Sequence, residues 1–275
     1  MKKFFLAVAI ACLTFSMSDA QRLVILHTND THSQIEPLRT GRNEGLGGVD
    51  RRLQFIDSVR HEYGKKKVLL LDAGDYNQGT PYFTMAKGDL EQALMNALGY
   101  DAITLGNHEF DNGLDELARR ISTSKCPILM CNYGVEGTPL EPYVKPYTII
   151  KRGGLKIGIV GATSYLESNV MYEYIKNMEH LDTVAEVNKW ADYLKNSEKC
   201  DMVIFLSHLG FDGGDYDRPS DHVVAAESSN IDIIVGGHSH TFIDEPSYVV
   251  NKKGKEVIIV TAGAQGVEIG ELKVY

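Results

Sequence analysis

The stretch LVILHTNDTH, residues 23–32, shows the pattern on which the fold of this chain depends. Its first four residues are all apolar, as in a strand of a sheet that is covered on both faces. The polar residues that follow include Asp30 and His32, two positions apart. In an extended chain, side chains two positions apart face the same side. The stretch therefore predicts a buried strand that ends in a pair of candidate metal ligands.

Four more mostly apolar runs lead into polar residues in the same way. The runs at 68–71, 102–105, 203–206 and 231–235 precede the sequences DAGD (72–75), GNHEFD (106–111), SH (207–208) and GGHSH (236–240). Helical patterns lie between the runs, at 49–61, 89–98, 114–121 and 181–194. This alternation predicts a single α/β domain over residues 21–275, with a mixed sheet system covered by helices.

Two other regions have the patterns of antiparallel strands. Residues 147–150 and 156–160 flank Gly153-Gly154, which predicts a β-hairpin. The segments 248–250, 257–260 and 270–274 near the end of the chain are also expected to be antiparallel strands.

The carboxyl ends of strands in an α/β sheet converge on one crevice. Five strand ends would therefore bring together seven side chains that can ligate a metal through oxygen or nitrogen: Asp30, His32, Asp75, Asn107, His208, His238 and His240. Seven such ligands suit two divalent cations better than one. A carboxylate would bridge the two cations, because its two oxygens can each hold one of them. The set contains no cysteine, which argues against a structural zinc site.

Each of these elements also has a purely structural interpretation. A single histidine at a strand end is more often a hydrogen-bonded polar residue than a ligand, and Gly74-Asp75 alone would be read as a turn. Five such elements in order, each directly after an apolar run, favour one shared site over five unrelated structural roles.

The series Asp30-x-His32, Gly74-Asp75, Gly106-Asn107-His108-Glu109, His208 and Gly237-His238-x-His240 resembles the calcineurin-like metallophosphoesterases. The fuller sequences HTNDTH (27–32), GDYNQG (74–79) and NHEFD (107–111) are similar to the catalytic domain of secreted 5′-nucleotidases. The resemblance covers nearly all of residues 22–275. It implies a four-layer α/β/β/α sandwich and an enzyme that hydrolyses phosphate monoesters, above all 5′-nucleotides.

The resemblance also implies a role for each site residue. One metal ion would be held by Asp30, His32, Asp75 and His240, and the other by Asp75, Asn107, His208 and His238, with Asp75 shared. His108 would be the catalytic histidine, with Asp111 orienting it, and Asn107 and His108 would contact the substrate. A metal-bound water would attack the phosphate, so no serine or cysteine nucleophile is needed. Mixed Asp, His and Asn ligation accepts Mn²⁺, Zn²⁺, Mg²⁺, Co²⁺ or iron.

In that family a second domain follows the catalytic one and supplies aromatic and arginine side chains for the substrate. This chain ends at Tyr275, soon after the last predicted strand. We therefore expect either a separate substrate-domain chain as a partner or activity of this domain on simpler phosphate esters. A phosphodiesterase, for example one acting on 2′,3′-cyclic nucleotides, and a non-enzymatic subunit that binds a phosphorylated ligand stay open as alternatives. The complete ligand set and the pair of His108 and Asp111 favour an enzyme.

The first twenty residues are typical of a secretory signal peptide. Lys2 and Lys3 precede an apolar run at 4–15, and Ser18-Asp19-Ala20 offers small residues before cleavage at position 21. A run of about 12 apolar residues is too short for a membrane span, which needs roughly 20. Cys12 has a poor context for lipidation. We expect an exported, periplasmic or extracellular protein without a membrane span in its mature form. The formal net charge of −9 disfavours binding to nucleic acid or to an anionic membrane.

Other residues with reactive side chains are assigned structural roles. His61, His180 and His222 lie in or beside predicted helices and are expected to serve the surface or packing. Cys126, Cys131 and Cys200 are expected to be free thiols, because an extended run at 127–130 holds the first two too far apart for a disulfide. Arg51 and Arg52 follow Gly47-Gly48 near the expected crevice, where they could bind phosphate or form salt bridges on a helix surface.

Overall fold

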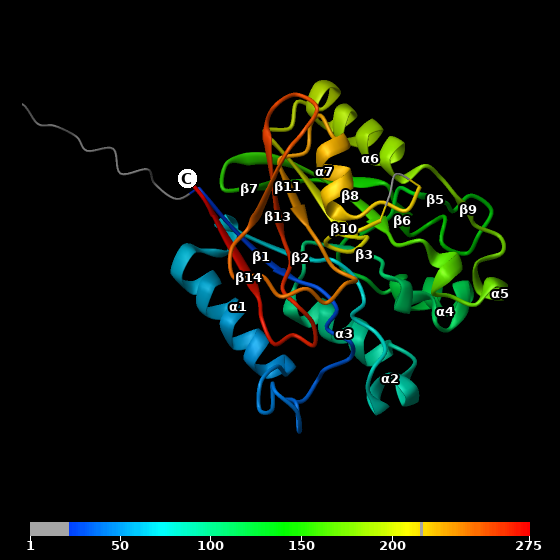
Figure 1. Cartoon of the computed structure of the whole chain (residues 1–275). Helices are drawn as coiled ribbons and strands as arrows, with labels where there is room; N and C mark the ends of the chain where they lie inside the picture. Colours follow the sequence, from blue (N-terminus) through cyan, green and yellow to red (C-terminus); the bar gives the residue numbers. More distant parts are fainter. Residues whose placement is uncertain (1–21, 215–216) are drawn as a thin grey trace, which may run out of the picture.

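The computed structural model describes residues 22–214 and 217–275. The predicted signal peptide, including Cys12, lies outside the described residues. Two six-stranded sheets are stacked face to face (Figure 1). Helices α1 (Val49–Tyr63) and α3 (Asp89–Leu98) lie on one side of the pair, and α6 (Thr183–Asp192) and α7 (Asp221–Glu227) lie on the other. This is the predicted four-layer α/β/β/α sandwich, so the prediction of the fold class is confirmed.

The first sheet contains the early strands of the chain and its last one. Its order is β14-β1-β2-β3-β4-β6, and all neighbours are parallel except β14, which is antiparallel to β1. The strands are β1 (Leu23–Thr28), β2 (Val68–Asp72), β3 (Ala102–Thr104), β4 (Ile128–Leu129), β6 (Val144–Lys145) and β14 (Gly270–Val274). The helices of this half are α1 (Val49–Tyr63), α2 (Pro81–Ala86), α3 (Asp89–Leu98) and α4 (Gly113–Ile121).

The second sheet has parallel strands in its centre and an antiparallel strand at each edge. Its order is β12-β13-β11-β10-β8-β7. The strands are β7 (Tyr147–Arg152), β8 (Leu155–Thr163), β10 (Met202–His208), β11 (Ile233–Val235), β12 (Ser247–Val250) and β13 (Glu256–Val260). Helices α6 (Thr183–Asp192) and α7 (Asp221–Glu227) cover its outer face. A small sheet of β5 (Tyr133–Gly134) and β9 (Glu179–His180) lies near the short helix α5 (Tyr172–Ile175) (Figure 1).

Strand β1 shows how the layers are held together. Its successive side chains point to opposite faces of the sheet. Val24 and Leu26 belong to the core between this sheet and its helices, whereas Leu23 and Ile25 belong to the core between the two sheets. All four are completely buried. Each such side chain contributes roughly 1.5–3 kcal/mol through burial, so both faces of the strand hold it in one register.

Most predicted elements are present. The helices predicted at 49–61, 89–98 and 114–121 correspond to α1, α3 and α4, and the predicted hairpin corresponds to β7 and β8. The helix predicted at 181–194 begins at Thr183 as α6 and continues as a π-helical turn, Tyr193–Ser197.

The predicted C-terminal strands are present and each has an antiparallel neighbour, with one parallel pairing that was not predicted. Strand β13 is antiparallel to β12, as expected, but its other neighbour is β11, to which it is parallel. Strand β14 leaves this group and pairs with β1 in the first sheet. Short apolar segments indicate burial but do not identify the neighbouring strand.

The three cysteines of the described residues are free thiols, as predicted. Cys131 and Cys200 are buried, and Cys126 is half-buried. Burial raises the pKa of the Cys126 thiol to about 11, so this side chain stays protonated at neutral pH.

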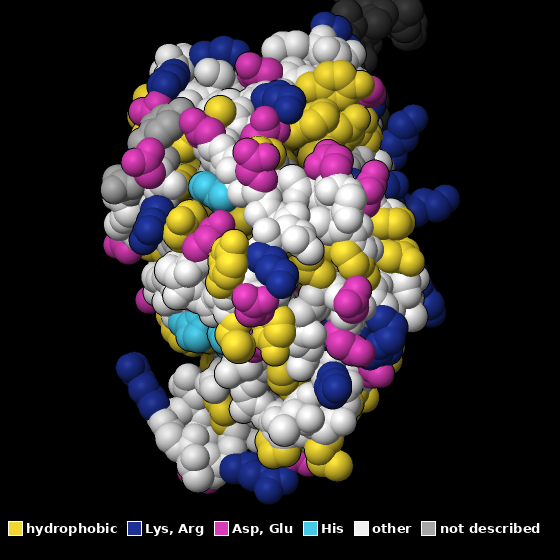
Figure 2. Space-filling view, turned by 90° about the vertical axis from the view of Figure 1, so that its right-hand side faces the viewer, with side chains coloured by type: hydrophobic (Ala, Val, Ile, Leu, Met, Phe, Trp, Pro, Cys, Tyr) yellow, Lys and Arg dark blue, Asp and Glu magenta, His cyan; other side chains and the backbone are white. Residues whose placement is uncertain are grey.

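None of the helices in residues 22–214 and 217–275 has the length and apolar character needed to cross a membrane. Figure 2 shows acidic and basic side chains interspersed over one face of the molecule.

The two sheets approach closely at Gly161 of β8. A Cβ atom at this position would lie 2.4 Å from the Cβ atom of Leu129 and 2.7 Å from its carbonyl oxygen. We expect Gly161→Ala to lower the free energy of unfolding by about 1–3 kcal/mol, because β8 must move away from β4. Gly134→Ala is the control, since its added Cβ would make only ordinary contacts at 3.5 Å or more. Urea denaturation measures both variants, and equal midpoints would contradict the expectation.

Candidate metal centre

The predicted ligands lie at the ends of strands from both sheets. Asp30 and His32 follow β1, Asp75 follows β2, Asn107 follows β3, His208 ends β10, and His238 and His240 follow β11. Six of them form two groups, Asp30 with His32 and His240, and Asp75 with His208 and His238. Within each group the candidate ligand atoms lie within 4.8 Å of one another. The seventh, Asn107, is buried, and its Oδ1 lies 3.5 Å from the hydroxyl of Ser164.

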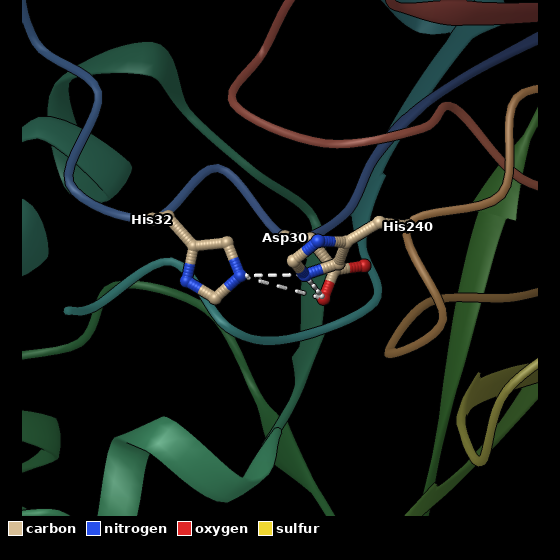
Figure 3. A group of neighbouring side chains, drawn as sticks. All are labelled: Asp30, His32 and His240. Atoms are coloured by element: carbon tan, nitrogen blue, oxygen red, sulfur yellow. Dashed lines mark hydrogen bonds and ion pairs between the residues drawn. The ribbon is translucent and has the colours of Figure 1, made fainter. Parts of the chain in front are cut away.

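The first group is centred on Asp30 (Figure 3). Its Oδ1 lies 3.4 Å from His240 Nε2 and 3.8 Å from His32 Nε2, and these two nitrogens are 2.8 Å apart. Oδ2 of Asp30 accepts hydrogen bonds from Asn29 Nδ2 and from the backbone N–H of His238. Oδ1 is buried without a hydrogen-bond partner among the described residues. A buried oxygen that faces two imidazole nitrogens in this way fits a cation.

The second group is centred on Asp75. Its Oδ2 lies 3.1 Å from His208 Nε2, and its Oδ1 accepts a hydrogen bond from the backbone N–H of His108. His208 Nδ1 lies 2.6 Å from the carbonyl oxygen of Ala73 and donates to it, which directs Nε2 into the site. Because His208 Nε2 is also 4.0 Å from Asp30 Oδ1, the two groups are adjacent.

Negative charge predominates around His208. Burial lowers the pKa of His208, but the carboxylates of Asp75 and Asp30 outweigh burial and raise it to about 10. Burial alone would raise the pKa of Asp75. The charge of His208 outweighs this effect and holds the pKa of the Asp75 carboxyl below its usual range. Burial and the neighbouring His208 lower the pKa of His238 to about 4. A site that holds a proton so firmly on one buried imidazole also favours a divalent cation.

Five of the seven predicted ligands have a left-handed backbone. Their φ angles lie between 46° and 78°, at Asp30, His32, Asp75, His238 and His240. Residues other than glycine rarely adopt this conformation, and where they do the strain often marks a functional site. The extended geometry predicted for residues 30–32 is therefore wrong. Asp30 and His32 meet at one site because the chain turns sharply between them.

His108 and Asp111 form the predicted pair beside the first group. His108 Nδ1 lies 2.9 Å from Asp111 Oδ2, and the His108 ring packs edge-on against the His32 ring at 5.5 Å. Burial lowers the pKa of His108, but the hydrogen bond with Asp111 and the charge of Asp75 outweigh it and raise the pKa above its usual value. The His108 side chain is 29% exposed, so a substrate can reach it.

Glu109 holds two ligand loops together, a role that the sequence did not indicate. Its buried carboxylate accepts hydrogen bonds from the backbone N–H groups of Asp75, Gly106 and Asn77, at 2.9, 2.7 and 3.2 Å. The loops after β2 and β3 are thereby connected at the position where Asp75 adopts its left-handed conformation. The signal in the sequence was the charged residue Glu109, which stands directly before the apolar Phe110.

The histidines and arginines that were set aside lie outside the two groups. His61 is exposed on α1, and His222 contacts the carbonyl oxygen of Phe211 and the hydroxyl of Ser247. Arg51 and Arg52 line a cavity of about 230 Å³ between α1 and the segment 266–269. Arg52 is buried, so a salt bridge on the helix surface does not describe it.

The fold and the site define the chain as a metal-dependent phosphoester hydrolase. Residues 23–242 match the model of the calcineurin-like phosphoesterase family, and the chain belongs to that family. The family is one of dinuclear metal enzymes, in agreement with the two adjacent ligand groups. The resemblance identified from the motifs is thus confirmed, whereas the role of each single residue stays a prediction.

The chain is similar to several 5′-nucleotidases. It is 37% identical to the 5′-nucleotidase of Rattus norvegicus and also 37% identical to the snake venom 5′-nucleotidase of Naja atra. Each match covers 92% of this chain, together with 46% of the rat protein and 50% of the venom protein. The solved structure of a 5′-nucleotidase precursor from Thermus thermophilus superposes with a TM-score of 0.80 at 32% identity, covering 92% of this chain and 51% of that one. The solved structure of the NAD nucleotidase of Haemophilus influenzae superposes with a TM-score of 0.78 at 29% identity. This match covers 92% of the present chain and 47% of the nucleotidase. The chain spans about half the length of these relatives.

The contacts of Glu109 lead to a prediction about metal affinity. We expect Glu109→Gln to weaken the binding of divalent cations by about 10–100-fold, because its amide group cannot accept all three backbone N–H groups. Glu116→Gln, on the exposed side of α4, is the control. Isothermal titration with Mn²⁺ measures the affinity, and a folded Glu109→Gln variant with parental affinity would refute the role.

The raised pKa of His208 predicts how cation binding depends on pH. With a pKa of about 10, His208 carries a proton at pH 7 that a cation at its Nε2 must displace. Affinity should therefore increase as the pH rises, by up to about tenfold per pH unit below that pKa. Titration calorimetry in buffers of different ionisation enthalpy counts the released protons. A count of zero at pH 7 would contradict the assignment of His208 as a ligand.

Proposed function

We propose that the chain is an exported enzyme that hydrolyses phosphate monoesters, with 5′-nucleotides as its main substrates. The observation that carries this proposal is the position of the His108–Asp111 pair directly beside two adjacent carboxylate–histidine groups. The 37% identity to 5′-nucleotidases of Rattus norvegicus and Naja atra supports the choice of substrate. Export rests on the pattern of residues 1–20.

Two divalent cations fit the predicted ligands. One would be held by Asp30, His32, Asp75 and His240, and the other by Asp75, Asn107, His208 and His238. The unpartnered Oδ1 of Asp30 and the fixed ring of His208 support this assignment. When bound, a pair of Mn²⁺, Zn²⁺, Mg²⁺, Co²⁺ or iron ions would activate water and offset the charge of the phosphate.

His108 would supply the proton at the phosphate. Its Nδ1 is occupied by Asp111, so only Nε2 is left to donate a hydrogen bond to a phosphoryl or leaving oxygen. The raised pKa of His108 favours the protonated ring that this donation requires. Asn107, the neighbouring residue, would contact the phosphate through its amide group. These side chains act on the phosphate itself, which is common to all the candidate substrates.

Recognition of the rest of a nucleotide would involve a further domain. The relatives are about twice as long as this chain, and the resemblance places their substrate contacts in a second domain. We propose that an equivalent domain, in the same protein or in a partner, makes these contacts when the substrate is a nucleotide. Simple phosphate esters would need only the residues described above.

An assay of the full chain tests the proposed function. The substrates are a 5′-nucleotide, a 2′,3′-cyclic nucleotide and p-nitrophenyl phosphate, each with Mn²⁺, Mg²⁺, Zn²⁺ or Co²⁺ added. We expect hydrolysis of both monoesters. Exclusive hydrolysis of the cyclic substrate would identify a phosphodiesterase instead. If the chain binds cations but hydrolyses none of the three substrates, the alternative of a non-enzymatic binding subunit is favoured. Mass spectrometry of the exported protein should find Gln21 at its N-terminus.

The role of His108 predicts a large loss of rate. We expect His108→Ala to lower kcat for p-nitrophenyl phosphate by about 10²–10⁴-fold, because the proton donor to the phosphate is lost. The affinity for Mn²⁺ should stay close to that of the parent, since the predicted ligand side chains are intact. His61→Ala on the exposed face of α1 is the control. A His108→Ala variant with the parental kcat would rule out the catalytic role.

A further inference from the structure

The cavity of about 230 Å³ between α1 and the segment 266–269 lies outside the metal centre, because no predicted metal ligand lines it. One part of its lining is apolar and the other is positively charged. None of the described residues that line it is acidic, although the chain has a formal net charge of −9. The residues used below are the apolar Leu46, Phe55 and Val267 and the charged Arg51 and Arg52.

The guanidinium group of Arg52 is buried in the wall of this cavity without an ion pair. Arg52 is only 6% exposed, and its Nε has no hydrogen-bond partner in the part of the chain that the structure describes. No described carboxylate forms an ion pair with it. Three guanidinium atoms lie 3.7–3.9 Å from the position of a Cβ atom at Gly266, another lining residue, so the group faces the cavity. A buried charge of this kind is costly unless an opposite charge accompanies it.

The groups on the inner side of Arg52 do not neutralise its charge. Arg52 interacts with the hydroxyl of Tyr100, which is uncharged at pH 7 because burial raises its pKa. Burial also raises the pKa of Asp72 to about 7, so this carboxyl carries only part of a negative charge at neutral pH. Glu91 lines a small adjoining cavity together with Arg52, but the two form no ion pair. The side that faces the larger cavity is therefore where an anion would stabilise Arg52.

A ligand for this lining needs one negative charge and an apolar body. The planar guanidinium of Arg52 matches the two oxygens of a carboxylate. A phosphate dianion would bring a second charge that no second buried cation offsets, because Arg51 is exposed and donates to the carbonyl oxygen of Gly45. The apolar part of the lining would remove a hydrocarbon group from water.

The volume limits the size of that group. Pockets for drug-sized ligands measure roughly 300–1,000 Å³, and this cavity of about 230 Å³ is smaller. It therefore fits a molecule with a single ring.

We propose that this cavity, the Arg52 site, binds a small aromatic carboxylate of the size of benzoate. The site consists of Arg52, Leu46, Phe55 and Val267. The carboxylate pairs with the guanidinium of Arg52, and the ring packs against the three apolar side chains. Binding at this site requires neither a metal ion nor phosphoesterase activity, so the inference is independent of the proposed function.

Titration calorimetry of the metal-free chain with benzoate tests the ligand class. Benzamide has nearly the same shape without the charge, and acetate has the charge without the ring. We expect benzoate to bind at least about tenfold more tightly than either, because only benzoate uses both parts of the lining. Equal binding of benzoate and benzamide would overturn the role of Arg52. Inorganic phosphate that binds as tightly as benzoate would overturn the choice of a carboxylate.

Two substitutions test whether benzoate binds in this cavity. Arg52→Met removes the charge and keeps a long side chain, so it should weaken benzoate binding at least about tenfold and leave benzamide binding unchanged. Leu46→Asp adds a like charge at a position that is 46% exposed, and it should also weaken benzoate binding. The matched controls are Arg60→Met and Leu53→Asp, both on α1 and both outside the cavity lining. They should keep the parental affinity.

The variants also define what would refute the Arg52 site. Parental affinity for benzoate in both cavity variants, or no saturable binding of benzoate to the parent chain, would overturn the proposal. If Arg52→Met does not fold, Leu46→Asp decides, because Leu46 lies at the surface and its replacement leaves the core intact. None of these measurements uses turnover. Failure of the Arg52 site and failure of the proposed phosphoesterase function are therefore distinguishable.

Discussion

The site depends on the burial of two carboxylates, Asp30 and Asp75, between two sheets. A buried charge is costly unless opposite charges and hydrogen bonds surround it. Here the compensation comes from imidazoles and from backbone N–H groups, including those of His238 and His108. It is incomplete, because Oδ1 of Asp30 has no hydrogen-bond partner among the described residues. The high pKa of His208 reflects the same excess of negative charge. A pair of divalent cations would balance it.

The stacking of the two sheets brings these carboxylates and imidazoles together. Asp30 and Asp75 follow strands of the first sheet, whereas His208, His238 and His240 come from the second. The apolar core between the sheets, with residues such as Ile25 and Leu206, fixes the separation of the two sets. Changes in this core would therefore reach the site.

Much of this arrangement could be predicted from the sequence. Apolar runs followed by Asp, Asn and His residues indicated which strand ends meet at the candidate site, because parallel strands finish on the same edge of a sheet. The neighbours of β13 and β14 could not be predicted, since an apolar segment does not identify its partner strand. The left-handed turns at Asp30 and His32 were also missed. They are imposed by contacts with the loop after β2, where the N–H groups of Asp30 and His32 donate to Gly74 and Asp75 carbonyl oxygens.

The run Gly106-Asn107-His108-Glu109 shows why some motifs are so specific. A Cβ atom at position 106 would lie 2.2 Å from Asp75 Oδ1, so the carboxylate occupies the room that a side chain would need. The N–H of His108 donates to that same oxygen, and Glu109 accepts from the N–H of Asp75. Three of the four residues thus act on Asp75 directly. Residues that share one partner do not contribute independently. The residues of this motif therefore act together to position Asp75, and their order in the sequence follows from that geometry.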